Sequence, residues 1–494
     1  MALITITHLT FSYEGAVLPV FEDLNLQLDT NWKLGVVGRN GRGKTTLLGL
    51  LEGRLQGKGT ISCPEPCRCV PQPILDPTLP TERVLEELSQ GEELWRLQRE
   101  LRLLGLEETI LDRPFQSLSG GEQTRALLAA LFLGQRDYLM LDEPTNHLDG
   151  PGRQMVARYL SRLKRGFLLV SHDRDFLDGC VDHILALNKT GTEVVRGDCS
   201  SWLREKQARD QGELARNQEL RGEIRRLEQA VRRTGDWSDR VERTKYGSKN
   251  SGLRPDRGYV GHKAAKLMKR SKSLENRQKQ AIEEKQGLLR DVERYDALKL
   301  ITAPSLSSRC LLQARDASIA LGGKPVLQGV NFAMEPGERV CLAGGNGCGK
   351  TSLLRLLLGE TEPDTGVIQR ASGLEISYVP QNTGFLQGNL MEWVEGQGIE
   401  APLLLGVLRK LDFPRELFSV DMAFYSAGQK KKLLLAASLS QRAHLYVWDE
   451  PLNYIDLYAR MQLEELIVRE KPTLLFVEHD QAFCRAVATR TVSL

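Results

Sequence analysis

The sequence contains the same series of motifs twice. Five short motifs of the N-terminal half recur in the same order in the C-terminal half, four of them 306 or 307 residues later and one 309 residues later. The pairs are GRNGRGKT at 38–45 with GGNGCGKT at 344–351, VPQ at 70–72 with VPQ at 379–381, SGGE at 119–122 with SAGQ at 426–429, LDEP at 141–144 with WDEP at 448–451, and SHD at 171–173 with EHD at 478–480. Such a nearly constant spacing indicates a duplicated domain. We therefore predict two similar domains, at 1–200 and 301–494, and a separate segment at 201–300.

The first motif pair predicts two phosphate-binding loops. Each copy has the pattern GxxxxGK[ST], follows an apolar run and precedes a Leu-rich run, as a loop between a strand and a helix does. Glycines let backbone N–H groups approach the phosphates, and the helix N-terminus favours negative charge. We expect Lys44 and Lys350 to reach the β- and γ-phosphates of ATP, and Thr45 and Thr351 to bind Mg²⁺. The other loop residues assigned to ATP binding are Gly38, Asn40, Gly41, Gly43 and Thr46 in the first copy and Gly344, Asn346, Gly347, Gly349 and Ser352 in the second.

Two acidic pairs predict the catalytic groups. The apolar runs YLMLDE and LYVWDE end in Asp-Glu and are typical of buried parallel strands. At the carboxyl ends of these strands we expect Asp142 and Asp449 to hold Mg²⁺ through water. Glu143 and Glu450 come next and are placed to orient and deprotonate the attacking water.

A histidine follows a further apolar run in each half. His172 comes after FLLV and His479 after LLFV. A single histidine is more often structural, but two at matching positions favour contact with the γ-phosphate. We therefore add both histidines to the predicted catalytic groups.

The segment between the halves is strongly basic. Residues 221–279 contain 18 Lys/Arg and 7 Asp/Glu, a net charge of +11, whereas the whole chain carries +3. An excess of this kind is typical of binding to a polyanion, nucleic acid first. Apolar residues at near-helical spacing on both sides of the segment predict two long helices packed as an antiparallel coiled coil.

Between these helices, the glycines and proline of 235–262 predict a break and a wide loop at the tip of the hairpin. We assign contact with the nucleic-acid partner to four apolar or aromatic residues in this loop, Trp237, Tyr246, Leu253 and Tyr259. A solvated spacer is the alternative interpretation, but spacers are usually shorter or rich in Gly and Ser.

Composition narrows the class of protein. No apolar run approaches the ~20 residues that span a bilayer, and the N-terminus reads as a strand and not as a signal peptide. Nine cysteines, an odd number, are spread along the chain, and the cluster at 63, 67 and 69 lacks the spacing of a zinc site. We therefore expect reduced thiols and a cytoplasmic protein that does not contact membranes.

These motifs resemble the ATP-binding cassette family in both halves, and LSGGE at 118–122 is similar to that family's signature. The resemblance implies two tandem α/β cassette ATPase domains facing head to tail within one chain, so that a monomer suffices. Each ATP would lie between the phosphate loop of one half and the signature of the other. It also implies ATP contacts by Gln72, Ser119, Gly120, Gly121 and Glu122, and by Gln381, Ser426, Gly428 and Gln429.

The second half departs from this pattern at two places. Its signature is YSAGQ, with Ala427 where the family has Gly. The aromatic residue that stacks on adenine is present as Tyr13, but the counterpart region at 319–322 has no aromatic. We therefore expect the second site to hold adenine less firmly.

The chain has two cassettes joined by a basic segment of about 100 residues. This arrangement resembles the ABC-F family, whose members act on the ribosome. YSAGQKKK at 425–432, DEPLNYID at 449–456 and GHKAAKLMKRSK at 261–272 are similar to its Lsa-type antibiotic-resistance branch. The resemblance implies a linker that enters the tRNA exit site, near 23S rRNA and P-site tRNA, and reaches toward the peptidyl-transferase centre. It implies protection from pleuromutilins, lincosamides and streptogramin A.

Two other functions fit parts of the sequence. One is a translation factor that relieves stalled ribosomes without any drug. The other is the ATPase subunit of a membrane transporter, for which a basic linker has no evident task.

Overall fold

The computed structural model describes residues 2–15, 19–71, 74–134, 137–146, 148–188, 191–244, 296–304, 306 and 308–494, and eight scattered positions between 266 and 282. The chain divides into two compact units. One unit contains both repeated halves, Met1–Trp202 and Tyr295–Leu494, and the other is Leu203–Arg294. The two halves therefore pack together, as the predicted pairing within one chain requires.

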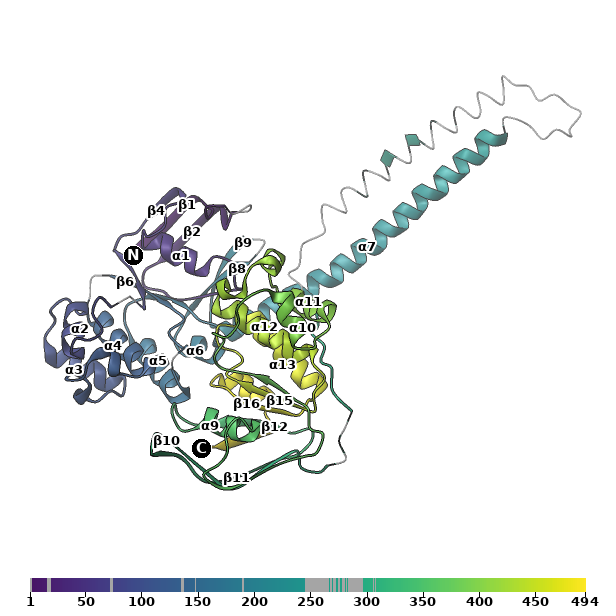
Figure 1. Cartoon of the computed structure of the whole chain (residues 1–494). Helices are drawn as coiled ribbons and strands as arrows, with labels where there is room; N and C mark the ends of the chain where they lie inside the picture. Colours follow the sequence, from purple (N-terminus) through teal and green to yellow (C-terminus); the bar gives the residue numbers. More distant parts are fainter. Residues whose placement is uncertain are drawn as a thin grey trace, which may run out of the picture. The chain divides into compact units, whose positions relative to one another are not determined.

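Two sheets build the first half (Figure 1). An antiparallel sheet has the strand order β2-β1-β4, and a larger sheet has the order β5-β6-β7-β3-β8-β9, parallel except for the β8–β9 pair. The strands are β1 (Leu3–Phe11), β2 (Phe21–Asp29), β3 (Lys33–Gly38), β4 (Lys58–Ser62), β5 (Cys67–Val70), β6 (Tyr138–Asp142), β7 (Phe167–Val170), β8 (His183–Asn188) and β9 (Gly191–Arg196). Apolar runs such as Phe167–Val170 form the central parallel strands because both faces of the sheet are covered.

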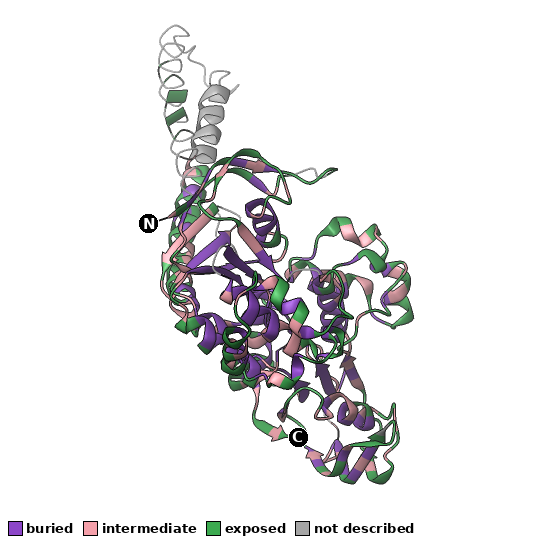
Figure 2. Cartoon of the chain, turned by 90° about the vertical axis from the view of Figure 1, so that its left-hand side faces the viewer, coloured by how far each residue is buried: buried purple, intermediate pink, exposed green. Residues whose placement is uncertain are grey.

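Helices of the first half cover the larger sheet and form a lobe beside it, where α2, α3 and α4 pack together (Figure 1). The helices are α1 (Lys44–Leu51), α2 (Thr81–Leu88), α3 (Leu94–Leu103), α4 (Gly120–Leu133), α5 (Gly150–Arg162) and α6 (Arg174–Asp178), with 3-10 turns η1 (Glu108–Ile110) and η2 (Phe115–Ser117). Figure 2 shows the central strands and the inner faces of these helices as buried.

The second half repeats this arrangement. Its antiparallel sheet has the order β11-β10-β13, and its parallel sheet has the order β14-β15-β16-β12-β17. The strands are β10 (Leu312–Leu321), β11 (Lys324–Met334), β12 (Arg339–Ala343), β13 (Thr365–Arg370), β14 (Ile376–Val379), β15 (Leu445–Asp449), β16 (Leu474–Val477) and β17 (Arg490–Ser493). The helices are α9 (Lys350–Leu358), α10 (Leu390–Gly396), α11 (Ala401–Lys410), α12 (Ala427–Ser440), α13 (Leu457–Glu470) and α14 (Gln481–Val487), with η3 (Arg415–Ser419) and η4 (Met422–Phe424). The fold class predicted from the repeated motifs is thus confirmed.

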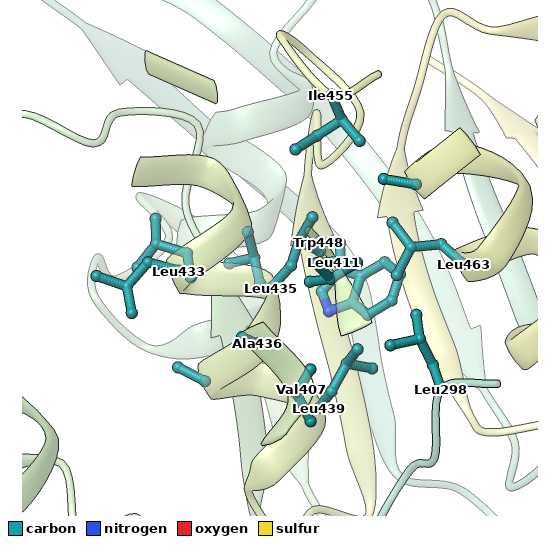
Figure 3. Packing of buried hydrophobic residues seen from close by; sticks show 14 of the residues in the cluster. Leu298, Val407, Leu411, Leu433, Leu435, Ala436, Leu439, Trp448, Ile455 and Leu463 are labelled. Carbon is teal, nitrogen blue, oxygen red and sulfur yellow. The ribbon is translucent and has the colours of Figure 1, made fainter. Parts of the chain in front are cut away.

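Trp448 lies near the centre of the second half's core (Figure 3). The indole is buried among leucines of α12 and α13, including Leu435 and Leu463, and its N–H donates to Ser438 Oγ at 3.0 Å. This packing fixes the end of β15, which carries the acidic pair Asp449 and Glu450.

A single helix, α7 (Cys199–Thr244), leads into the basic segment. Its 46 residues correspond to about 69 Å at 1.5 Å per residue. Its expected apolar stripe is present, since Leu220 and Ile224 are buried. The predicted break at Gly235 is wrong, because the helix continues to Thr244. One glycine costs a helix only about 1 kcal/mol, and the nearest proline is Pro255.

The remaining predictions for this segment fall largely outside the described residues. Trp237 lies on α7 and not in a loop, while Tyr246, Leu253 and Tyr259 are among the residues that are not described. The eight described positions between 266 and 282 are helical, so the returning helix and the coiled-coil pairing stay predictions. Within the described part of the chain, no helix is both long and apolar enough to cross a membrane.

Candidate nucleotide sites

Both predicted phosphate loops connect a central strand to a helix, β3 to α1 and β12 to α9. Gly43 and Gly349 precede the two helices with φ of 84° and 97°. A Cβ on Gly43 would lie 2.6 Å from a Val20 methyl carbon, so glycine is required for both conformation and space. Lys44 Nζ donates to Gly38 O at 2.8 Å, and Lys350 Nζ to Gly345 O at 2.8 Å. The two ammonium groups thus lie inside their loops, where phosphates are expected.

The predicted magnesium ligands come together in both halves. Thr45 Oγ1 donates to Asp142 Oδ2 at 3.1 Å, and Thr351 Oγ1 to Asp449 Oδ2 at 3.0 Å. Burial raises the pKa of Asp449 to about 6, and its Oδ1 is buried with no hydrogen-bond partner among the described residues. A buried carboxylate with a spare oxygen beside a hydroxyl is a donor set that suits Mg²⁺. When bound, the ion would neutralise charge on the transferred phosphoryl group.

The predicted catalytic glutamates lie at the same strand ends. Glu143 and Glu450 both have positive φ, 49° and 48°, a conformation that is rare for residues other than glycine and is often found at functional sites. Burial raises the pKa of Glu143 to about 7, whereas Arg460 and Lys44 act to lower it. A carboxylate with this pKa is suited to accept a proton from water near neutral pH.

Each predicted histidine faces the glutamate of its own half. His172 Nε2 lies 3.4 Å from Glu143 Oε1, and His479 Nε2 lies 3.8 Å from Glu450 Oε1. Burial lowers the pKa of His479 to about 4, with Arg153 adding to the shift. Burial likewise lowers the pKa of His172 well below its usual value. Both imidazoles are therefore neutral at physiological pH and can donate one hydrogen bond to a phosphate oxygen.

One site, defined here as the second site, contains Lys350 and is a cavity of about 510 Å³ between the two halves. The second half contributes its phosphate loop, Gln381, Glu450 and His479. The first half contributes Gly120 and Gly121 of its signature, as the head-to-tail arrangement predicts. Sequence reasoning missed three further lining residues, Asn146, Leu148 and Val326.

The other site, the first site, contains Lys44 and is bridged by direct contacts between the halves. Asn40 Nδ2 donates to Tyr454 O at 3.0 Å, and the guanidinium of Arg39 lies 5.5 Å from the ring centre of Tyr458. Gly428 of the second signature lies close by, since a Cβ there would be 2.6 Å from Tyr454 O and 3.2 Å from Asn40 Nδ2. Burial lowers the pKa of Lys44, and the acidic group that most opposes this shift is Asp456 of the opposite half.

The signature residues also have a local role. Ser119 and Ser426 are the N-caps of α4 and α12, and each forms a reciprocal capping box with the residue three positions later. Glu122 and Gln429 are those partners, and each accepts a hydrogen bond from the N–H of the capping serine at 2.8 Å. Their side chains are therefore engaged in the caps, which orient the helix N-termini. Ala427, the departure from the family pattern, is the exposed first residue of α12.

The structure describes only some of the residues assigned to adenine stacking and to ATP contacts by glutamine. Tyr13 is 49% exposed, and its hydroxyl lies 2.9 Å from Thr46 Oγ1 beside the phosphate loop. In the second site, Val326 of β11 lines the cavity. Gln381 Nε2 donates to Glu450 Oε2 at 2.8 Å, whereas Gln72 lies outside the described residues.

Sequence reasoning also missed a buried Arg–Asp ion pair that occurs in each half. Arg153 Nη1 lies 2.9 Å from Asp173 Oδ2, and Arg460 Nη1 lies 3.0 Å from Asp480 Oδ2. These pairs hold α5 and α13 against the loops that carry the histidines. The spacing of 307 residues between the two arginines was the signal available in the sequence.

Comparison with known proteins agrees with this geometry. A family model described as ABC transporter matches residues 21–146 and 327–453. The chain is 30% identical to ATP-binding protein Uup of Caulobacter vibrioides over 487 residues, covering 96% of this chain and 75% of the relative. It is 28% identical to ribosome protection protein VmlR of Bacillus subtilis over 490 residues, covering 97% and 84%. Its fold is similar to that of the archaeal ribosome recycling factor aABCE1, with a TM-score of 0.64, 20% identity and coverage of 98% and 87%.

Proposed function

Because the chain belongs to the ATP-binding cassette family and is an ATPase, we propose that ATP binding and hydrolysis control its attachment to the ribosome. Its curated relatives are ABC-F ATP-binding proteins. The observation that carries the proposal is the similarity to a ribosome protection protein along 97% of this chain, linker included. The net charge of +11 over 221–279 supports it, because such a segment suits rRNA phosphates.

The residues of each site divide the work of hydrolysis. Lys44 or Lys350 holds the phosphates, and the Asp–Thr pair holds Mg²⁺. Glu143 or Glu450 accepts the proton of the attacking water, while the neutral histidine beside it donates to the γ-phosphate. The signature of the opposite half completes the site, so that bound ATP favours the paired arrangement and hydrolysis weakens it. The paired state is the one that binds the ribosome.

In this proposal the protein acts in the cytoplasm as a monomer and defends the peptidyl-transferase centre against antibiotics, as a member of the Lsa-type branch. The linker enters from the tRNA exit site and contacts 23S rRNA and P-site tRNA. Its tip disfavours bound lincosamides, pleuromutilins and streptogramin A.

The deciding experiment is a panel of minimum inhibitory concentrations in a sensitive host that expresses the protein. We expect at least about fourfold higher values for the three drug classes and unchanged values for drugs that act elsewhere. A variant lacking 249–257 should keep ATPase activity and ribosome pelleting but lose resistance. Unchanged sensitivity to every drug in the panel would refute the resistance proposal.

A translation factor without a drug role is the second candidate. The similarity to Uup, a relative named only as an ATP-binding protein, is of the same extent as that to VmlR, so a drug role does not follow from similarity alone. This candidate predicts ribosome pelleting and growth defects in a deletion strain, with no change in drug sensitivity. Pelleting with membranes and not with ribosomes would instead indicate the third possibility, a transporter subunit.

A further inference from the structure

The two halves differ at one buried pair of positions beside the catalytic groups. The first half has Thr124 and Ser171, and 307 residues later the second half has Lys431 and Glu478. Both charged side chains are almost fully buried, with exposed fractions of 2% for Lys431 and 6% for Glu478. The second half thus has one buried base and one buried acid where the first half has two neutral residues.

Lys431 joins two segments that meet at Glu450. Its Nζ donates to Pro380 O at 2.9 Å and to Asp449 O at 3.0 Å. Pro380 directly precedes Gln381, and Asp449 directly precedes Glu450. The side chains of Gln381 and Glu450 are themselves hydrogen-bonded at 2.8 Å. The lysine therefore fixes the backbone on both sides of this contact.

Glu478 joins two other segments of the same site. Its Oε1 accepts from the N–H of Leu452 at 2.7 Å, and its Oε2 accepts from the N–H of His479 at 2.9 Å. Burial raises the pKa of Glu478, and Arg460 and Arg153, the arginines of the two buried ion pairs, act to lower it. Between them, the hydrogen bonds of Lys431 and Glu478 reach the Gln381 loop, the end of β15, Leu452 and His479.

At the matching positions of the first half, the contacts among the described residues are local. Thr124 Oγ1 donates to Gly120 O of its own helix at 2.9 Å. Ser171 Oγ lies 3.4 Å from Thr145 Oγ1 and accepts from the N–H of Asp173 at 3.2 Å. Glu143 and His172 are therefore positioned without a buried charge from these two positions.

We propose that Lys431 and Glu478 are positioning residues for ATP hydrolysis at the second site. Together they hold Glu450 and His479 in the orientation that the reaction needs, and the first site does not depend on them. The proposal rests on the ATPase activity and is independent of the role on the ribosome.

The test measures each site alone. In a Glu143→Gln background, phosphate release reports on the second site, and in a Glu450→Gln background it reports on the first. In the first background we expect Lys431→Thr and Glu478→Ser each to lower kcat at least about 10-fold, because small misplacement of catalytic groups is costly, while KM for ATP stays within about threefold. The double variant loses both sets of hydrogen bonds and should be at least as impaired as either single variant.

The controls make the outcome specific. Lys430→Thr removes a neighbouring, half-buried lysine of the same helix and should leave kcat unchanged. In the Glu450→Gln background all of these variants should keep first-site kcat within about twofold. If a single variant fails to fold, the double variant and the near-isosteric Glu478→Gln still test the idea. Equal losses at both sites, unchanged kcat in the single variants, or a double variant that regains the kcat of its parent would each overturn the proposal.

Discussion

Replacing Gly428 by alanine should open the first site. The new Cβ would lie 2.6 Å from Tyr454 O and 3.2 Å from Asn40 Nδ2, closer than side chains normally approach. Gly428 and Tyr454 both belong to the second half, so reaching an ordinary contact of about 3.4 Å requires the Tyr454 carbonyl to move by about 0.8 Å within that half. The Asn40–Tyr454 hydrogen bond, now 3.0 Å, would then be lost.

The free-energy cost of the substitution follows from two effects, the overpacking and the lost hydrogen bond. One hydrogen bond contributes about 1 kcal/mol, and overpacking costs about 1–3 kcal/mol. Because the overpacking strains the second half alone, only the lost hydrogen bond of about 1 kcal/mol weakens pairing of the halves, by about fivefold. We would measure ATP retention at the first site in a Lys350→Ala background, by rapid filtration.

The matched control is Gly406→Ala on α11, where a Cβ meets nothing within 4 Å. Alanine there should leave ATP retention unchanged and stabilise the fold by about 1 kcal/mol. If Gly428→Ala retains ATP as well as the parent does, the close approach of Gly428 to Tyr454 does not limit pairing.

Three other outcomes are expected. The double variant Glu143→Gln with Glu450→Gln should bind ATP, hydrolyse it at under about 1% of the normal rate and remain on pelleted ribosomes; hydrolysis at the normal rate would exclude both residues as bases. Removing a stacking ring costs on the order of 1 kcal/mol, so Tyr13→Ala should lower the ATP-over-GTP preference of the first site several-fold, as measured in a Lys350→Ala background. In a Lys44→Ala background, which reports on the second site, Tyr13→Ala should leave this preference unchanged. Neutralising cations of the linker should weaken ribosome pelleting and make its salt dependence shallower. An unchanged salt slope would show that these cations do not contact the ribosome. The cations are Arg221, Arg225, Arg226, Arg232 and Arg233, with Lys263, Lys266, Lys269, Arg270 and Lys272.

The repeated motifs point to residues that the structure brings together, because the chemistry of a phosphate loop needs particular residues at particular places. A loop that binds phosphate needs Gly43 at positive φ, and a strand that ends in Asp-Glu brings Asp142 to Thr45. These constraints are local, so they can be read from spacing alone.

Contacts between the halves could not be read in this way. Asn40 is 414 residues from Tyr454, and the bond is made by a backbone carbonyl that has no sequence signature. The end of α7 was misjudged for a different reason, because Gly235 weakens a helix without necessarily ending it. Lys431 was overlooked because three consecutive lysines suggest a solvated surface, whereas Lys431 and Lys432 are both buried.

The covalent joining of two copies has a consequence for symmetry. In a dimer of identical chains every substitution appears at both interfaces, so an ion pair that helps one site is imposed on the other. Here each half has its own codons, and the pair Lys431 and Glu478 occurs once while its counterparts remain Thr124 and Ser171. The two ATP sites can therefore hydrolyse ATP at different rates within one molecule.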